Sequence, residues 1–124
     1  MSNWSGTILK ARDFKVQGNN VYVTKNNGVP GMLLLKAEWC GHCKHFQSTF
    51  NEIADSIGSD FGCMSIDSEE ITQELTTALN FQGFPTIKFV DQKGRIIGEY
   101  SGERTKDAIL QEICKVFHHC IAKH

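Results

Sequence analysis

Two cysteines separated by two residues are the feature of this sequence that points most directly to chemistry. Cys40 and Cys43 lie in the stretch EWCGHCK, with Gly41 and His42 between them. A pair at this spacing can bind a metal ion, form a structural disulfide, or exchange electrons with other thiols. Which of the three applies depends on the elements that hold the pair and on the side chains near it.

The expected position of the pair favours electron exchange. A strand is expected to end just before Cys40 and a helix to begin there, and the first turn of a helix has unpaired N–H groups and a partial positive charge. Both stabilise a thiolate, which is the nucleophilic form of cysteine. Cys40 is therefore predicted to attack a substrate disulfide, and Cys43, one helical turn further on, to resolve the mixed disulfide.

The residues next to the pair are expected to tune it. A partly protonated His42 adds positive charge beside Cys40, which favours the reduced thiolate and makes the disulfide a stronger oxidant. Gly41 permits close approach of a substrate. Trp39 is predicted to form a flat apolar wall for a bound substrate, with ordinary packing as the alternative.

An alternation of strand and helix patterns must position these residues. The apolar run MLLLKA at 32–37 is typical of a strand buried on both faces, and apolar residues at spacings of three and four predict helices. The expected order is a strand at 32–37, a helix over 46–57, a strand at 61–67, a helix capped by Asp67 or Ser68, a hairpin over 86–100 and a helix from about Thr105. This order predicts an α/β fold with a central mixed β-sheet and helices on both faces.

The chain of 124 residues predicts a single domain with an atypical beginning. Residues 1–31 are expected to form an N-terminal arm with short extended pieces at 14–16 and 21–24, separated by turn-forming Gly and Asn residues. Residues 32–124 are expected to form the catalytic part of the domain.

The motifs AEWCGHCK at 37–44 and GFPTIKF at 83–89 resemble those of the thioredoxin superfamily, with an active site of the protein disulfide isomerase type. The resemblance covers roughly residues 32–117 and implies a thioredoxin fold and thiol–disulfide oxidoreductase activity. It also implies a cis Phe84–Pro85 bond facing the cysteines, with an extended substrate bound against these two residues. No metal and no cofactor are expected.

Arg104 is a further candidate for tuning the pair. The segment YSGERTKDAI at 100–109 resembles the family's approach to its last helix, where isomerase-type domains carry an arginine that swings toward the resolving cysteine. The resemblance implies that Arg104 lowers the pKa of Cys43 and speeds release of the substrate. A solvated surface arginine is the alternative.

Leu34 is the main departure from the family pattern. Family members usually carry a buried Asp or Glu six residues before the first cysteine, where it accepts the proton of the second. Leu34 cannot accept this proton, so its acceptor must be water, Lys36 or Glu38, or there is none. The resolving step is therefore predicted to be slow. Ser48 replaces a helix-kinking proline, so the helix is expected to run straighter.

The other three of the five cysteines are expected to stay outside the reaction. Cys63 is predicted to be a small buried side chain in a core strand. Cys114 and Cys120 are six residues apart on one predicted helix, which is roughly 9 Å of rise. That is too far for a disulfide without distortion, so Cys120 is expected to be a free thiol or, alternatively, to cross-link two chains.

Two other functions stay open. Cys40 and Cys43 have zinc-ligand spacing, and the stretch HHC at 118–120 could complete a non-enzymatic metal site. A thioredoxin-like adaptor would keep the fold and bind partners without turnover. The cysteine motif favours the enzyme over both.

The predicted partners are proteins with disulfides or dithiols, together with a reductase or oxidant that the sequence does not identify. The direction of the reaction stays open. The net charge of −1 and the pI of about 6.5 provide no attraction to nucleic acid or to an anionic membrane. No signal-peptide pattern and no membrane-spanning run is found, so a cytoplasmic location is expected, or the virion or host cytoplasm if the gene is viral.

Overall fold

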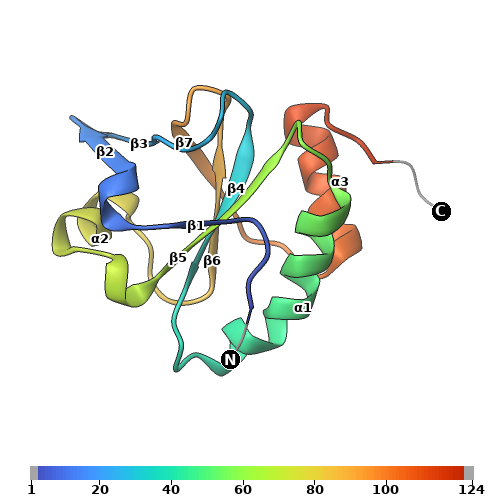
Figure 1. Ribbon diagram of the computed structural model, residues 1–124, viewed down its shortest axis with the longest axis horizontal. Coiled ribbons are helices and arrows are strands. Elements are labelled where there is room, and N and C mark those ends of the chain that lie inside the picture. Colours follow the sequence, from blue (N-terminus) through green and yellow to red (C-terminus); the bar gives the residue numbers. More distant parts are fainter. Residues whose placement is uncertain (1–2, 122–124) are drawn as a thin grey trace.

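A five-stranded mixed β-sheet forms the centre of the molecule in the computed structural model, which describes residues 3–121 (Figure 1). The strands lie in the order β1 (Thr7–Leu9), β5 (Gly62–Asp67), β4 (Gly31–Lys36), β6 (Thr86–Val90) and β7 (Ile96–Tyr100). The first three run parallel to one another, whereas β6 and β7 are antiparallel to their neighbours. The mixed sheet expected from the sequence is therefore confirmed.

The central position of β4 explains its uninterrupted apolar run. All six of its residues are buried. Met32 and Leu34 belong to one core cluster, and Leu33 and Leu35 belong to another. Because successive side chains of a strand point to opposite faces, a strand with a packed layer on each side must be apolar at almost every position.

Helices cover both faces of the sheet, as expected. α1 (Gly41–Ser56) and α3 (Lys106–Phe117) lie on one face, and α2 (Gln73–Leu79) lies on the other together with a small β-hairpin (Figure 1). α1 continues without a break through Ser48, the position of the family's proline. None of the helices within residues 3–121 is long and apolar enough to cross a membrane.

The second helix begins later than predicted. Asp67 caps only a short 3-10 helix, Ser68–Glu70, by accepting the N–H of Glu69 at 3.1 Å. α2 begins after Thr72, whose hydroxyl accepts the N–H of Leu75 at 3.2 Å. The backbone at Ile71 is extended, so the two caps start two separate helices instead of one.

The N-terminal segment contributes more structure than expected. The two predicted extended pieces form the antiparallel hairpin of β2 (Phe14–Gln17) and β3 (Asn20–Val23). The sequence analysis missed β1, which pairs in parallel with β5 and so joins the central sheet. A strand of three residues has no periodicity to detect, and its partner is distant in the sequence. The division of the chain at residue 31 stays a prediction.

The prediction for Cys114 and Cys120 was wrong. α3 ends at Phe117, and His118 has a left-handed backbone, with φ of 58°, that reverses the chain. The reversal brings the two cysteine Cα atoms to 4.4 Å, and the sulfurs form a disulfide. Cys120 is therefore neither a free thiol nor a cross-link between chains. The predicted distance assumed that both cysteines lie on one helix, whereas Cys120 lies beyond the end of α3.

Candidate active site

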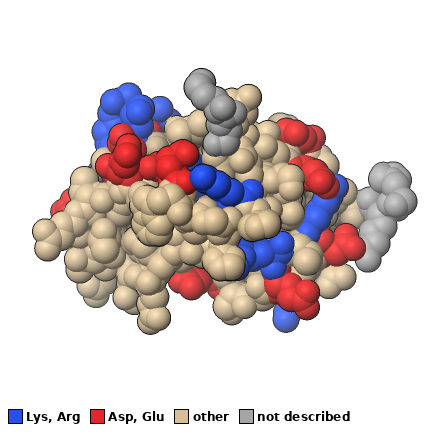
Figure 2. Space-filling model, turned by 90° about the horizontal axis from the view of Figure 1, so that it is seen from below, with Lys and Arg blue, Asp and Glu red and all other residues tan. Residues whose placement is uncertain are grey.

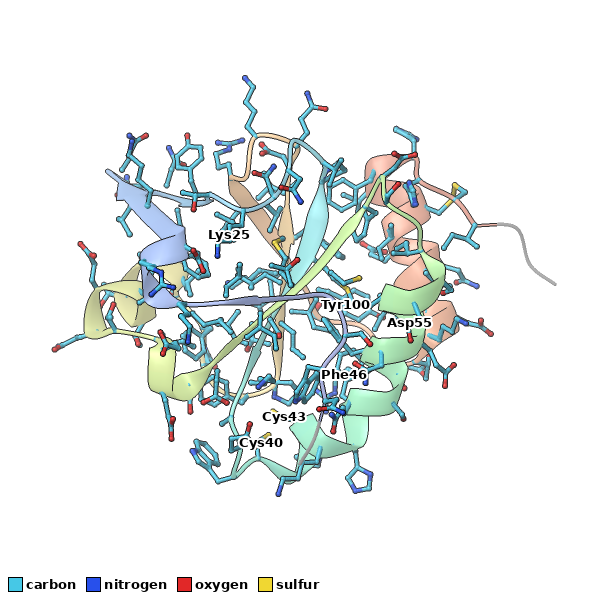
Figure 3. All side chains as sticks on the ribbon, viewed as in Figure 1. Lys25, Cys40, Cys43, Phe46, Asp55 and Tyr100 are labelled. Atoms are coloured by element: carbon cyan, nitrogen blue, oxygen red, sulfur yellow. A yellow bond between two sulfur atoms is a disulfide. The ribbon has the colours of Figure 1, made fainter. Side chains whose placement is uncertain are left out.

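The cysteine pair lies where β4 leads into α1. Cys40 caps the helix: its backbone is extended, and its sulfur accepts the N–H of Cys43 at 3.1 Å. The N–H of Cys40 donates to the carbonyl of Ala37 at 3.1 Å, which closes the turn between strand and helix. Figure 3 shows the two cysteines next to each other at this end of the sheet. The Cys40 sulfur thus meets an N–H donor and the positive end of a helix, both of which favour a thiolate.

The two sulfurs are in unequal surroundings. Both thiols are free, with 6% of Cys40 and 1% of Cys43 exposed. Burial raises the pKa of Cys43 to about 12, and the hydrogen bond with Cys40 and the charge of Cys40 act in the same direction. A hydrogen bond from the backbone of Ala37 and the charge of Lys36 oppose this rise in the pKa. Cys43 therefore keeps its proton to a higher pH than an ordinary cysteine does.

A loop from the start of β6 faces the pair. The Phe84–Pro85 bond is cis, as expected. The carbonyl of Phe84 accepts a hydrogen bond from the Cys40 thiol at a sulfur–oxygen distance of 3.6 Å. The Thr86 hydroxyl donates to the carbonyl of Gly83 at 2.6 Å and ties the loop together. The fold therefore brings the second sequence motif directly against the first.

Aromatic side chains lie on the surface beside the pair. Trp39 is 75% exposed and meets the ring of Phe84 edge-on at 5.8 Å, and Phe84 in turn contacts Phe81 at 5.3 Å. An open groove of about 440 Å³ next to them is lined by residues 80–86 and Glu99. Figure 2, which looks onto this end of the molecule, shows a broad uncharged area at its lower left. The exposed Trp39 ring and the half-buried rings of Phe81 and Phe84 at the edge of a groove are suited to contact a peptide.

Two predicted tuning residues lie at the pair and one does not. His42 is exposed in the first turn of α1. Gly41 is also exposed, and no atom lies within 4 Å of the place where a Cβ would be, which leaves room for a substrate. Arg104 lies in the exposed loop between β7 and α3. In the described part of the chain, the charges that act on the pKa of Cys43 come from Cys40 and Lys36, without Arg104.

The ligand set considered for zinc is not assembled. The HHC stretch follows the C-terminal end of α3, away from the beginning of α1 (Figure 1). Cys120 is held in the disulfide with Cys114. Within residues 3–121, no group of three or more His, Cys, Asp or Glu side chains could hold a metal ion.

Lys36 is a charged residue of this region that neither motif singled out. It is 5% exposed, although it is charged. Its ammonium lies 3.4 Å from a carboxylate oxygen of Asp67, 3.8 Å from one of Glu38 and 4.9 Å from the ring centre of Trp4. The sequence analysis named Lys36 only as one possible acceptor for the proton of Cys43, and its burial at the end of an apolar strand was not predicted.

The comparisons with known proteins agree with the two motifs. The family model Thioredoxin matches residues 14–115. Protein disulfide isomerase-like 1-1 of Arabidopsis thaliana is 36% identical over 83 residues, which are 64% of this chain and 17% of that protein. A protein disulfide-isomerase of Datisca glomerata is 33% identical over 97 residues, covering 75% of this chain and 19% of that protein. The chain thus spans less than a fifth of the length of these relatives.

Solved structures share the fold at low identity. The Trx4 domain of ERdj5 superposes with a TM-score of 0.73 at 18% identity, and the match covers 93% of this chain and 97% of that one. Human ERp44 form I gives a TM-score of 0.71 at 17% identity, over 93% of this chain and 30% of that one. Together with the family model and the capped cysteine pair opposite a cis proline, these similarities show that the chain belongs to the thioredoxin family.

Proposed function

We propose that this chain is a thiol–disulfide oxidoreductase of the protein disulfide isomerase type that acts on protein substrates. One observation carries the proposal: the Cys40 sulfur caps α1 by accepting the N–H of Cys43 at 3.1 Å, and it faces the carbonyl of Phe84. A sulfur that accepts an N–H at the beginning of a helix, beside a buried, protonated thiol, suits an exchange in two steps. The similarity to protein disulfide isomerases supports the same reaction.

The reaction proceeds through a mixed disulfide. The Cys40 thiolate attacks one sulfur of a substrate disulfide, and the other substrate sulfur leaves as a thiolate. Cys43 then loses its proton and attacks the Cys40 sulfur, so the Cys40–Cys43 disulfide forms and the mixed disulfide breaks. The two cysteines supply both electrons that reduce the substrate, and the reverse sequence oxidises a substrate dithiol. Neither a metal nor a cofactor takes part.

The neighbouring residues bind the substrate and tune the pair. An extended substrate segment lies against Phe84 and Pro85, and Trp39 provides an apolar wall. Gly41 leaves space for its approach, and a protonated His42 stabilises the reduced form of Cys40. For Arg104 the proposal requires the loop before α3 to move toward Cys43 during the reaction, since this side chain is exposed in the loop.

The partners and the location complete the proposal. Proteins with disulfides or dithiols are the substrates, and a separate reductase or oxidant resets the pair. We propose a cytoplasmic location. A disulfide such as Cys114–Cys120 is uncommon in reducing compartments, so its redox state in cells tests the location.

The reduction potential of the Cys40–Cys43 pair is the first measurement. The protein is equilibrated in glutathione buffers, free thiols are alkylated, and masses are read; a Cys114→Ser/Cys120→Ser variant removes the second disulfide from the result. We expect a value nearer that of protein disulfide isomerase, about −180 mV, than that of thioredoxin, about −270 mV. A value near −270 mV would identify a reductase, and a pair that never cycles would contradict the proposal.

A trapping experiment tests the roles of the two cysteines. Cys43→Ser should accumulate a mixed disulfide with a protein substrate such as insulin, because the resolving thiol is missing. Cys40→Ser should form none. An adaptor would bind the substrate without reducing it, and a zinc protein would show the additional mass of the metal. Either of these two outcomes would replace the proposed enzyme by one of the alternative functions.

A further inference from the structure

Lys36 is a buried lysine whose charge is compensated on three sides. Lysine is almost never fully buried unless it is paired. The Asp67 carboxylate, which is 19% exposed, lies 3.4 Å from the ammonium, and the register of β4 and β5 places the two residues directly opposite each other. Glu38 lies at 3.8 Å but is 64% exposed, so solvent screens its charge. The Trp4 ring covers the ammonium at 4.9 Å from its centre.

The lysine lies on the same face of the sheet as α1 and the cysteine pair. Lys36 is two residues after Leu34 in β4, so both side chains point to the face covered by α1. The next residue, Ala37, packs against Cys40 and Cys43. Ala37 also accepts the N–H of Cys40, at 3.1 Å. Lys36 therefore directly precedes, along the chain, the residue that packs against both cysteines.

The charge of Lys36 acts on the buried thiol. Burial and Cys40 raise the pKa of Cys43, whereas a hydrogen bond with the backbone of Ala37 and, less strongly, the ammonium of Lys36 lower it. The titratable and charged groups that face this region are Asp67 from β5, Glu38 from the turn before α1, and Cys40 at the beginning of α1. Lys36 is the only cation among them in the described part of the chain.

We propose that Lys36 is a positioning residue for the resolving step, in which its ammonium stabilises the Cys43 thiolate as it forms. The inference rests on the proposed function. In this step the S–H bond of Cys43 breaks and its proton passes to solvent, while its sulfur forms a bond to the Cys40 sulfur. The bond between Cys40 and the substrate sulfur breaks, and the substrate thiolate leaves with the electron pair and takes up a proton from solvent. Lys36 keeps its proton throughout and thus supplies charge where Leu34 supplies none.

The test follows the resolving step alone. The protein carries a mixed disulfide between Cys40 and glutathione, and release of glutathione is measured by acid quench and mass spectrometry from pH 6 to pH 10. Lys36→Met and Lys36→Gln remove the charge, and Lys36→Arg keeps it. Lys88→Met is a matched control, because Lys88 is also buried and paired, with Glu99 at 2.8 Å, but pairs in register with Leu33, whose side chain faces away from α1.

We expect the neutral variants to release glutathione about threefold more slowly at pH 7. A rise of one unit in the pKa of Cys43 reduces its thiolate fraction about tenfold, while the more basic thiolate is about threefold more nucleophilic. Because the pKa of about 12 lies above the measured range, the plot of log rate against pH should be displaced by about half a pH unit toward higher pH. Lys36→Arg should restore most of the rate, and Lys88→Met should match the wild type.

Three results would overturn the inference. The first is release from Lys36→Gln at the wild-type rate. The second is an equal slowing in Lys88→Met. The third is an equal slowing of the alkylation of Cys40 in a Cys43→Ser background, which would indicate general damage to the site. A wild-type protein that forms the mixed disulfide but never releases glutathione would instead contradict the proposed function.

Discussion

Leu34 stands where members of the family usually carry a buried carboxylate. It is completely buried, in the core cluster that contains Phe46 and Phe50. Its partner on β5 is Ser65, whose hydroxyl is buried without a hydrogen-bond partner in the described part of the chain. A carboxyl group introduced at residue 34 would therefore have a hydroxyl beside it and Lys36 on the same face of β4.

At this position we predict that Leu34→Glu accelerates turnover. A glutamate can accept the proton of Cys43, and we expect the release of glutathione from Cys40 to become about a hundredfold faster, at the lower end of general-base effects. Burying the carboxyl group should lower the free energy of unfolding by about 3 kcal/mol. Leu34→Gln is the control: it should lose similar stability without gaining rate, and an equal gain in both variants would contradict proton transfer.

Among the secondary-structure elements, α3 has an end that depends on a disulfide. Cys114 and Cys120 close a short loop around the left-handed His118. The following His119 ring nitrogen lies 3.0 Å from the carbonyl of Ile57, which ends α1, and Ile121 packs on the core cluster shared by α1 and α3. The disulfide thus fastens the chain after α3 to α1.

Loss of this disulfide should lower stability moderately. For so short a loop, the reduced entropy of the unfolded chain corresponds to about 2 kcal/mol. We expect Cys114→Ser/Cys120→Ser to lower the free energy of unfolding in urea by that amount. The proposed role of the Cys40–Cys43 pair requires that release of glutathione from Cys40 stay at the wild-type rate. A Cys63→Ser variant is the control for removal of a thiol outside the loop.

A second element, the 3-10 helix Ala11–Asp13, depends on a buried carboxylate. Asp13 accepts the N–H of Lys10 at 2.8 Å, and its second oxygen lies 3.3 Å from the ammonium of Lys25. The hydrogen bond from the Lys10 backbone and the pairing with Lys25 lower the pKa of Asp13, and burial opposes them less strongly. Its backbone carbonyl accepts the N–H of Thr24, so the residue joins two segments of the N-terminal region.

The lowered pKa of Asp13 predicts a loss of stability in acid. A carboxylate with a lower pKa in the folded state stabilises the fold fully above its unfolded value, near about pH 4, and this contribution disappears as the pH falls below that value. Asp13→Asn should lower the free energy of unfolding by about 2 kcal/mol at pH 7 and by less at pH 2. An equal loss at both pH values would contradict a role for the charge.

For the whole molecule, residues 3–5 connect the N-terminus to the face of the sheet that holds the site. The side chains of Gln47 and Asn51 donate to the carbonyl of Asn3 at 2.7 and 2.9 Å, and the N–H of Ser5 donates to Asn51 at 2.8 Å. Trp4 meets Phe50 edge-on at 5.7 Å and covers Lys36. Residues 3–5 therefore pack on α1 beside the buried lysine.

Replacing Trp4 should affect stability and catalysis together. Trp4→Ala removes a half-buried ring, and we expect the free energy of unfolding to fall by about 2 kcal/mol. Without the ring, water reaches the ammonium of Lys36 and screens its charge, so the release of glutathione should slow as well. Trp4→Phe keeps a ring, so its losses in the free energy of unfolding and in the rate of glutathione release should each be less than half of those in Trp4→Ala. A Trp4→Ala variant that loses stability but releases glutathione at the wild-type rate would contradict an influence of Trp4 on the active site.

Local patterns determined much of this protein. The buried strand β4, the amphipathic helix α1, the β6–β7 hairpin and the β2–β3 hairpin were all predictable, because each has its own periodicity or turn residues. The capped Cys40 was predictable for the same reason, since a strand that ends before a helix must present its last residues to the helix N-terminus. The loop at Pro85 followed from a second motif.

Only the tertiary structure decided the features that depend on distant partners. β1 exists because β5 offers it an edge, and the burial of Lys36 depends on Asp67 and Trp4, which lie on other segments. The Cys114–Cys120 disulfide depends on one left-handed residue, His118, that no periodic pattern encodes. In each case the stabilising contact joins groups that become neighbours only when the chain folds. The spacing of residues along the sequence therefore does not predict that contact.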